Sequence, residues 1–376
     1  MIRDAILQDA EALLRIELRS FDTDALSLRN FKYLLSEANA HTLVYEEEGR
    51  LLGYAIVLFH AGTSHARLYS LAVDPDARRR GIGSALREAA EEAARVEDCI
   101  SLRVEARRDD PVGSAFFERA GYRPFEQIED YYEDHMDAVR FEKGLAPRLS
   151  PDQVRVPFYQ QTLDFTCGPA ALLMAMQTLD PDLPVGRKLE LRIWRESTTV
   201  FMTAGHGGCG PYGLALSAYH RGFDVEVFVK DESALFVDSV RSDEKKEVIR
   251  LVQEDFVEEI QSLPIPLHYG SLSFAEMKRR YEEGGIPLVL ISSYRIYNEK
   301  FPHWVVVTGF DEGYIYVHDP LVDFENDKSV VDSINMPIPL KEFERMARYG
   351  KAGQRAVIIV KKRAAAAATS AGTGAH

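Results

Sequence analysis

The chain has 376 residues, which is too long for one ordinary domain and suits two. Of these residues, 46% are hydrophobic and 28% charged, as is usual for globular proteins. Its net charge of -14 argues against nucleic acid or an anionic membrane surface as a partner. No signal-peptide pattern and no run of about 20 apolar residues occurs, so we expect no membrane span and a cytoplasmic location. The three cysteines, Cys99, Cys167 and Cys209, have no CxxC spacing and predict neither a disulfide framework nor a metal site.

Helix and strand patterns alternate along the first 145 residues, which predicts an α/β domain over 1–145. The expected elements are a helix over 8–19, strands over His41–Glu47, Leu51–Phe59 and Ala66–Val73, a helix over about Gly83–Val96, a strand over Ile100–Ala106 and a helix over Ser114–Ala120.

Residues 146–153, which contain two prolines and show no periodicity, are expected to be a linker. The second domain is expected over 154–363, and the Ala/Ser/Thr/Gly-rich tail 364–376 is expected to be disordered. The expected elements of the second domain are helices after Cys167 and Pro211, a charged helix over 243–262, and strands over Pro287–Ser292, His303–Phe310, Tyr314–His318 and Ala356–Lys361. The segment 225–285 has no assigned role.

A glycine- and arginine-rich loop follows the strand that ends at Val73, and the pattern Arg78-x-x-Gly81-x-Gly83 then opens a helix. Glycines allow a ligand to approach the backbone closely, and a helix N-terminus presents free N–H groups to an anion. With three adjacent arginines, the loop predicts a cradle for a pyrophosphate. The alternative is a tight turn with a solvated arginine cluster.

This loop resembles the acetyl-CoA loop of the GNAT superfamily of N-acetyltransferases. The runs Leu102–Glu105 and Phe116–Tyr122 resemble a later strand–helix–strand segment of that family, and Tyr131–Ala138 is similar to the end of the ribosomal-protein alanine acetyltransferases. The resemblance covers 1–145 and implies a splayed central sheet and acetyl-CoA as cosubstrate. It implies main-chain contacts to acetyl-CoA from Leu71, Ala72, Val73, Arg78, Arg79, Arg80, Gly81, Ile82, Gly83 and Ser84.

Two positions depart from the GNAT pattern. Family members often have a tyrosine where this chain has Phe117, and that tyrosine protonates the leaving thiolate, which phenylalanine cannot do. They also often have asparagine where Asp110 falls. Cofactor binding is therefore better supported than catalysis. Tyr131 or Tyr132 is a candidate acid and Glu105 a candidate base, and the alternative is that both tyrosines are merely half-buried aromatics.

Cys167 lies just before an apolar helix in the second domain, and Pro169 suits the first helical turn. A cysteine at a helix N-terminus experiences the positive end of the dipole, which favours the thiolate that attack on a carbonyl needs. Gln161, six residues earlier, is a candidate donor to the oxyanion, together with the main-chain N–H of Cys167.

His303 heads an apolar strand, and the chain turns at 311–313 and returns to Asp319. In an antiparallel hairpin with that turn, paired residue numbers should sum to about 623, which places His303 beside Asp319. A carboxylate in that position would orient the imidazole and stabilise its charged form.

The set Gln161, Cys167, His303 and Asp319 resembles the papain-like peptidases that process bacteriocin precursors after a double glycine. The resemblance covers about 154–362 and implies a papain-like α+β domain. We therefore expect an enzyme with two activities on a peptide or protein substrate: acetyl-CoA-dependent N-acetylation and Cys–His–Asp amide hydrolysis or acyl transfer. The alternative is an acetyl-CoA-binding sensor or scaffold that regulates a peptidase or an inert peptide-binding domain.

Overall fold

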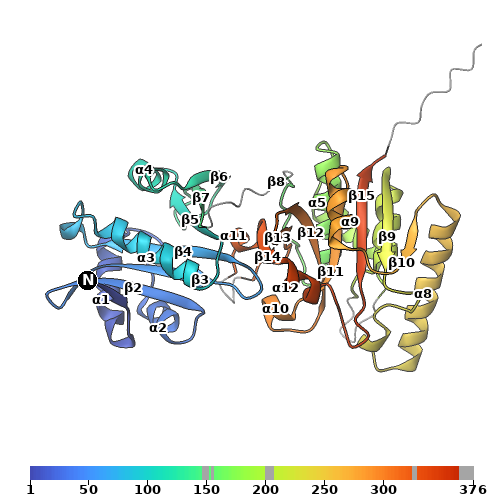
Figure 1. The fold of residues 1–376 in the computed structure, drawn as a ribbon, viewed down its shortest axis with the longest axis horizontal. Coiled ribbons are helices and arrows are strands. Elements are labelled where there is room, and N and C mark those ends of the chain that lie inside the picture. Colours follow the sequence, from blue (N-terminus) through green and yellow to red (C-terminus); the bar gives the residue numbers. More distant parts are fainter. Residues whose placement is uncertain (146–151, 154–155, 200–206, 324–327, 364–376) are drawn as a thin grey trace, which may run out of the picture.

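A computed structural model describes residues 1–145, 152–153, 156–199, 207–323 and 328–363 (Figure 1). Most of the predicted linker and the whole predicted tail lie outside these ranges. The chain forms two sheets, one from strands within residues 2–144 and one from strands within residues 152–362, so the last two residues of the predicted linker belong to the second sheet. The two sheets have separate hydrophobic cores. No described helix is long and apolar enough to cross a membrane.

The first sheet has seven strands in the order β1-β2-β3-β4-β5-β7-β6. β4 and β5 are parallel but pair only from His65↔Ser101 to Arg67↔Arg103, although both strands continue further. This separation is the splayed sheet that the resemblance implies. The elements are β1 (Ile2–Asp4), the 3-10 turn η1 (Leu7–Asp9), α1 (Ala10–Ser20), α2 (Leu28–Ser36), β2 (Ala40–Glu47), β3 (Arg50–Phe59), β4 (His65–Val73), η2 (Pro75–Ala77), α3 (Ile82–Val96), β5 (Ser101–Arg107), α4 (Pro111–Arg119), β6 (Arg123–Ile128) and β7 (Ala138–Gly144).

Helices cover both faces of this sheet because successive strand residues point to opposite sides. Ile56 packs in the core formed with α1 and α2, whereas its neighbour Val57 packs in the core formed with Leu86 and Ala90 of α3. The sheet is therefore the middle layer of three.

The second sheet has the order β10-β9-β15-β11-β12-β13-β14, and β8 also pairs with β12. Its elements are β8 (Asp152–Gln153), α5 (Cys167–Leu179), α6 (Arg187–Ser197), α7 (Pro211–Tyr219), β9 (Phe223–Val229), η3 (Val237–Ser239), α8 (Asp243–Ser262), β10 (Leu267–Tyr269), α9 (Phe274–Glu282), β11 (Ile286–Ser292), α10 (Tyr294–Tyr297), β12 (Pro302–Phe310), β13 (Tyr314–His318), α11 (Val330–Ser333), β14 (Met336–Pro339), α12 (Leu340–Met346) and β15 (Ala356–Lys362). The segment without an assigned role thus supplies β9, β10, α8 and α9.

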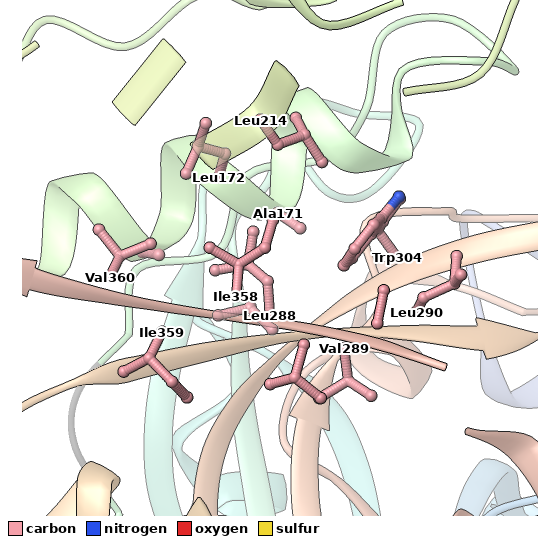
Figure 2. Close-up of a cluster of buried hydrophobic side chains, with 14 of the residues drawn as sticks. Ala171, Leu172, Leu214, Leu288, Val289, Leu290, Trp304, Ile358, Ile359 and Val360 are labelled. Carbon is pink, nitrogen blue, oxygen red and sulfur yellow. The ribbon is translucent and has the colours of Figure 1, made fainter. Parts of the chain in front are cut away.

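α5 lies across one face of this sheet (Figure 2). Ala171 and Leu172 of α5 and Leu214 of α7 are fully buried above Leu288 of β11 and Ile358 of β15. Full burial of a leucine or isoleucine side chain contributes about 1.5–3 kcal/mol. This packing fixes the start of α5, where Cys167 lies.

The predicted register of the β12–β13 hairpin is wrong by one to two residues. The observed pairs Val306↔His318 and Phe310↔Ile315 are separated by an irregularity between Val307 and Gly309. An extra residue on β12 shifts the register there, as in a β-bulge. Gly309, a glycine inside this strand, lies at the irregularity and is the residue in β12 that could have indicated it.

The two halves contact each other where the β3–β4 connection meets β14, and Figure 1 shows α11, β13 and β14 next to the first sheet. The main-chain N–H of Ser64 donates to the carbonyl of Pro337 at 2.8 Å, and the Thr63 hydroxyl donates to the same carbonyl at 3.2 Å. Arg103 of β5 donates to the carbonyls of Ile334 and Asn335.

Candidate active sites

Cys167 is the first residue of α5 and is partly exposed. The hydroxyl of Thr166, the N-cap residue, donates to the carbonyl of Leu163 at 2.8 Å, which fixes the turn before the helix. N–H groups in the first turn of a helix have no intrahelical acceptor and carry the positive end of the dipole. The sulfur therefore lies in a positive potential that also suits an oxyanion beside it.

Gly168 allows α5 to approach the sheet closely at this point. A Cβ at this position would lie 3.1 Å from Leu214 and 3.2 Å from Trp304. A side chain at this position would therefore fit only if Leu214 and Trp304 moved slightly away from α5.

His303 lies between Cys167 and Asp319. Its Nε2 is 2.6 Å from Oδ1 of Asp319, and both side chains are buried, so the predicted contact is present despite the shifted register. Burial alone would lower the pKa of His303, but the charges of Asp319 and Cys167, and hydrogen bonds to both, raise it to about 10. The charged imidazole is thus the stable form at neutral pH.

Gln161 is held next to the end of β13. Its main-chain N–H donates to the carbonyl of Pro320 at 2.9 Å, which brings it close to Asp319. Its side-chain Nε2 donates to the carbonyl of Leu163 at 3.0 Å. One amide N–H is therefore engaged, and the second remains for an oxyanion.

Asp319 is held by two further residues, and the sequence indicates neither of them. Lys328 Nζ lies 3.1 Å from Oδ2 of Asp319, and the hydroxyl of Tyr297 donates to the same oxygen at 2.6 Å. The pKa of Asp319 is lowered against the effect of burial, first by the charge of Lys328 and then by that of His303. Neither residue belongs to a motif or a periodic pattern, so only their position in the fold identifies them.

The other two cysteines are buried. Cys99 packs in the core between the first sheet and α3, and burial raises the pKa of its thiol to about 12. Cys209 precedes α7 and packs in the second core, and burial also raises its pKa. His220 is exposed and pairs with Glu259 at 3.1 Å, whereas His206 lies outside the described residues.

The residues predicted to hold acetyl-CoA line the open part of the first sheet. Leu71, Ala72 and Val73 lie on β4 beyond its last pair with β5, and Gly81 is the N-cap of α3 with a φ of 80°. No side chain caps this helix, so its first N–H groups are available to a pyrophosphate. This backbone fits the group.

The three arginines of this loop differ in their contacts. Arg78 Nε donates to the carbonyl of Val73 at 3.1 Å, whereas Arg80 forms an ion pair with Glu47 at 2.7 Å. Arg79 has a φ of 61°, which tightens the turn before α3. All three side chains are exposed.

Glu105 and Tyr131 lie together, joined by the buried Arg67. Arg67 Nε donates to Oε2 of Glu105 at 3.0 Å, and its Nη2 donates to the hydroxyl of Tyr131 at 2.8 Å. Oε1 of Glu105 is buried and has no hydrogen-bond partner among the described residues. Burial, partly offset by the charge of Arg67, raises the pKa of Tyr131 to about 12, so its hydroxyl keeps its proton at neutral pH.

Phe117 packs in the core between the first sheet and α3, against the rings of Phe116, Tyr122 and Phe141. It carries no proton to donate. Asp110, the other departure from the GNAT pattern, is the N-cap of α4 and accepts from the N–H groups of Val112 and Gly113 at 3.0 Å. Within the described ranges, no group of three or more His, Cys, Asp or Glu residues is placed to hold a metal ion.

Two family models match the chain. The one described as Peptidase_C39 like family matches residues 156–361, and the one described as Acetyltransferase (GNAT) family matches residues 7–122. An uncharacterized N-acetyltransferase of Methanocaldococcus jannaschii is 30% identical over 140 residues, which are 37% of this chain and 88% of that protein.

Two further relatives match the same half. A Bacillus subtilis protein, named provisionally as a [ribosomal protein bS18]-alanine N-acetyltransferase, is 26% identical over 134 residues, 36% of this chain and 87% of its own. The crystal structure of the ribosomal-protein-S18-alanine N-acetyltransferase from Escherichia coli is 24% identical with a TM-score of 0.37, and the match covers 40% of this chain and 96% of that one.

Proposed function

The chain belongs to the Peptidase_C39 like family and carries a GNAT acetyltransferase domain, and from this premise we propose that it is a cytoplasmic enzyme with two activities on peptide or protein substrates. One activity acetylates an amine with acetyl-CoA. The other cleaves or exchanges an amide bond through a thioester at Cys167. The observation that carries the proposal is the buried His303, placed between the sulfur of Cys167 and the carboxylate of Asp319.

In the second activity, Sγ of Cys167 attacks the carbonyl carbon of an amide. The free N–H of Gln161 and the main-chain N–H of Cys167 stabilise the oxyanion. The C–N bond breaks as His303 gives its proton to the leaving amine, and water or an acceptor amine then takes the acyl group from sulfur. Asp319 keeps the imidazole oriented and charged.

In the first activity, acetyl-CoA supplies an acetyl group activated as a thioester. The main chain of 71–73 and the start of α3 would bind it, as the open edge of β4 and the uncapped helix allow. Oε1 of Glu105 makes no hydrogen bond and lies 3.9 Å from Nε of Arg140, and we assign it the proton of the amine, whereas Tyr131 retains a proton to donate.

Alkylation of Cys167 tests the thiol activity without a known substrate. We expect iodoacetamide to label Cys167 well below pH 8.5, roughly the pKa of a free thiol, and His303→Ala to abolish labelling at low pH. The exposed His220→Ala is the matched control. A wild-type profile like that of a free thiol would refute this half of the proposal.

Release of free CoA with a mixture of peptide amines tests the acetyl transfer. Glu105→Gln should lower the rate by about 10²–10⁴, the usual contribution of a general base, without weakening acetyl-CoA binding measured by calorimetry. Glu126→Gln, which also removes a carboxylate paired with Arg140, is the control.

A second candidate function is favoured by Phe117, which occupies the position of the usual acid and is buried in the core. The first domain would then bind acetyl-CoA without turnover and act as a sensor for the second. Tight acetyl-CoA binding with no CoA release from any peptide amine would select this candidate.

A further inference from the structure

A single short segment, residues 328–333, lies between the two candidate sites. It begins with Lys328 next to the thiol site and includes Ser329 and Asp332, which contact the acetyltransferase domain. Asp332 is fully buried and so is Lys328, apart from a few per cent of its surface. Burial of charges at a domain junction is costly unless each is closely paired, so the partners of Lys328 and Asp332 decide whether the segment is stable.

On one side, Lys328 is enclosed by oxygen atoms. Its three N–H groups are shared among four oxygen atoms within hydrogen-bond distance: the hydroxyl of Tyr297 at 2.6 Å, the carbonyl of Leu321 at 2.6 Å, the hydroxyl of Ser333 at 2.8 Å and Oδ2 of Asp319 at 3.1 Å. The hydrogen-bond partners of Nζ among the described residues are all acceptors, as an ammonium group requires. Because Lys328 and Tyr297 both occupy Oδ2 of Asp319, Oδ1 is left to face His303.

On the other side, the segment holds Arg67 of β4. Arg67 Nη1 donates to the hydroxyl of Ser329 at 3.1 Å and lies 3.7 Å from Oδ2 of Asp332. That oxygen also accepts from the main-chain N–H of Ser329 at 2.9 Å, so the segment is folded around the contact. Arg67 is the same residue that holds Glu105 and Tyr131.

We propose that Lys328 is a positioning residue for the thiol site and that Arg67 of the acetyltransferase domain holds it in place through Ser329 and Asp332. This inference rests on the proposed thiol function. Arg67 touches both the candidate base of the first site and the segment that orients the second, so one side chain connects the two. The reactivity of Cys167 therefore depends on residues of the first domain that do not contact it.

The electrostatic reason is the burial of Asp319. Its pKa is lowered first by the charge of Lys328, so without that charge burial favours the protonated carboxyl. A protonated Asp319 can no longer stabilise the charged His303. Among the described residues, the charged and titratable groups that face Lys328 are Asp319, Tyr297, Asp323 and Asp332. Those that face Asp332 include His60, His65 and Arg67.

The test follows alkylation of Cys167 by iodoacetamide against pH in the full chain, with peptide mapping. We expect Lys328→Met to lower the rate at pH 6 by at least about tenfold, which corresponds to a shift of one pH unit. Arg67→Met should lower it in the same direction by at least about threefold, on the order of 0.7 kcal/mol. Acetyl-CoA is omitted, so turnover of the first domain does not enter.

Two controls separate positioning from general damage. Lys361→Met removes another paired lysine of the same domain, and Thr63→Val removes a junction hydrogen bond that does not involve 328–333. Both should keep the wild-type profile. The fluorescence of Trp194 and Trp304 reports folding of the second domain. If Lys328→Met or Arg67→Met is unfolded, Tyr297→Phe and Asp332→Asn replace them, with the same expected direction.

The outcomes distinguish the inference from the function on which it rests. If the reactivity of Cys167 at low pH is lost in His303→Ala but unchanged in Lys328→Met, the positioning role of Lys328 is overturned and the thiol function is left intact. A profile changed in Lys328→Met but unchanged in Arg67→Met and Asp332→Asn would overturn the connection between the domains. If wild-type Cys167 itself behaves as a free thiol, the thiol function fails and the inference fails with it.

Discussion

His318 should make the second domain sensitive to mild acid. The residue ends β13, next to Asp319, and is fully buried. Its Nε2 lies 2.8 Å from the carbonyl of Val156 and its Nδ1 accepts from the main-chain N–H of Asn335 at 2.9 Å, so the neutral tautomer with a proton on Nε2 satisfies both contacts. Burial lowers the pKa of His318 from 6.5 to about 4.

The size of the effect follows from linkage. The unfolded chain binds a proton at His318 near pH 6.5, whereas the folded chain binds it only near pH 4. The contribution of the neutral His318 to the free energy of unfolding is therefore fully present above pH 6.5 and is lost as the pH falls toward 4. Between pH 7 and pH 5 the loss amounts to about 2 kcal/mol in the free energy of unfolding.

Urea unfolding followed by tryptophan fluorescence measures this effect in the full chain, because both tryptophans, Trp194 and Trp304, lie in the second domain. His318→Gln cannot titrate, and we expect its stability to fall by about 2 kcal/mol less than that of wild type from pH 7 to pH 5. His220→Gln, on an exposed residue, should keep the wild-type dependence. An equal loss in His318→Gln and wild type would refute the argument.

Three further predictions concern packing and the cysteines. Gly213→Ala places a Cβ 2.6 Å from Cα of Ser197 and should lower the urea midpoint by the equivalent of about 1–3 kcal/mol or more, whereas Gly144→Ala, with open space around it, should not. Phe117→Tyr buries a hydroxyl in an aromatic cluster, so we expect a lower melting temperature and a loss of about 1–3 kcal/mol in the free energy of unfolding. CoA release should be no faster than in wild type, and a faster release at unchanged stability would contradict this. Iodoacetamide at pH 7 should label Cys167 before Cys99 or Cys209, because burial raises the pKa of both other thiols; mass mapping that finds Cys99 labelled first would refute this order.

The sequence predicts the parts of the molecule that local patterns encode. The strands over 41–59, the helix after the glycine-rich loop and the charged helix over 243–262 follow from periodicity, and the structure contains all of them within a few residues. The contact between His303 and Asp319 followed from one short turn and tolerated an error in register. The roles of the site residues themselves stay predictions until they are measured.

The parts that were missed depend on contacts between distant segments. Lys328 contributes to the candidate site only because the chain after β13 returns to Asp319, and Arg67 only because a second domain lies against β4. Neither contact leaves a periodic signal in the sequence. Buried charges of this kind are recognised by their partners, which only a three-dimensional arrangement supplies.

The junction has a consequence for anyone who divides this chain. Arg67 and Arg103 are the last residues at which β4 and β5 still pair, and both donate to groups of the second domain, to Ser329 and to Ile334. A fragment that ends at residue 145 would lose these contacts of the two guanidinium groups at the point where β4 and β5 separate. Each half has its own core, yet neither half produced alone would reproduce the surface that it presents in the intact protein.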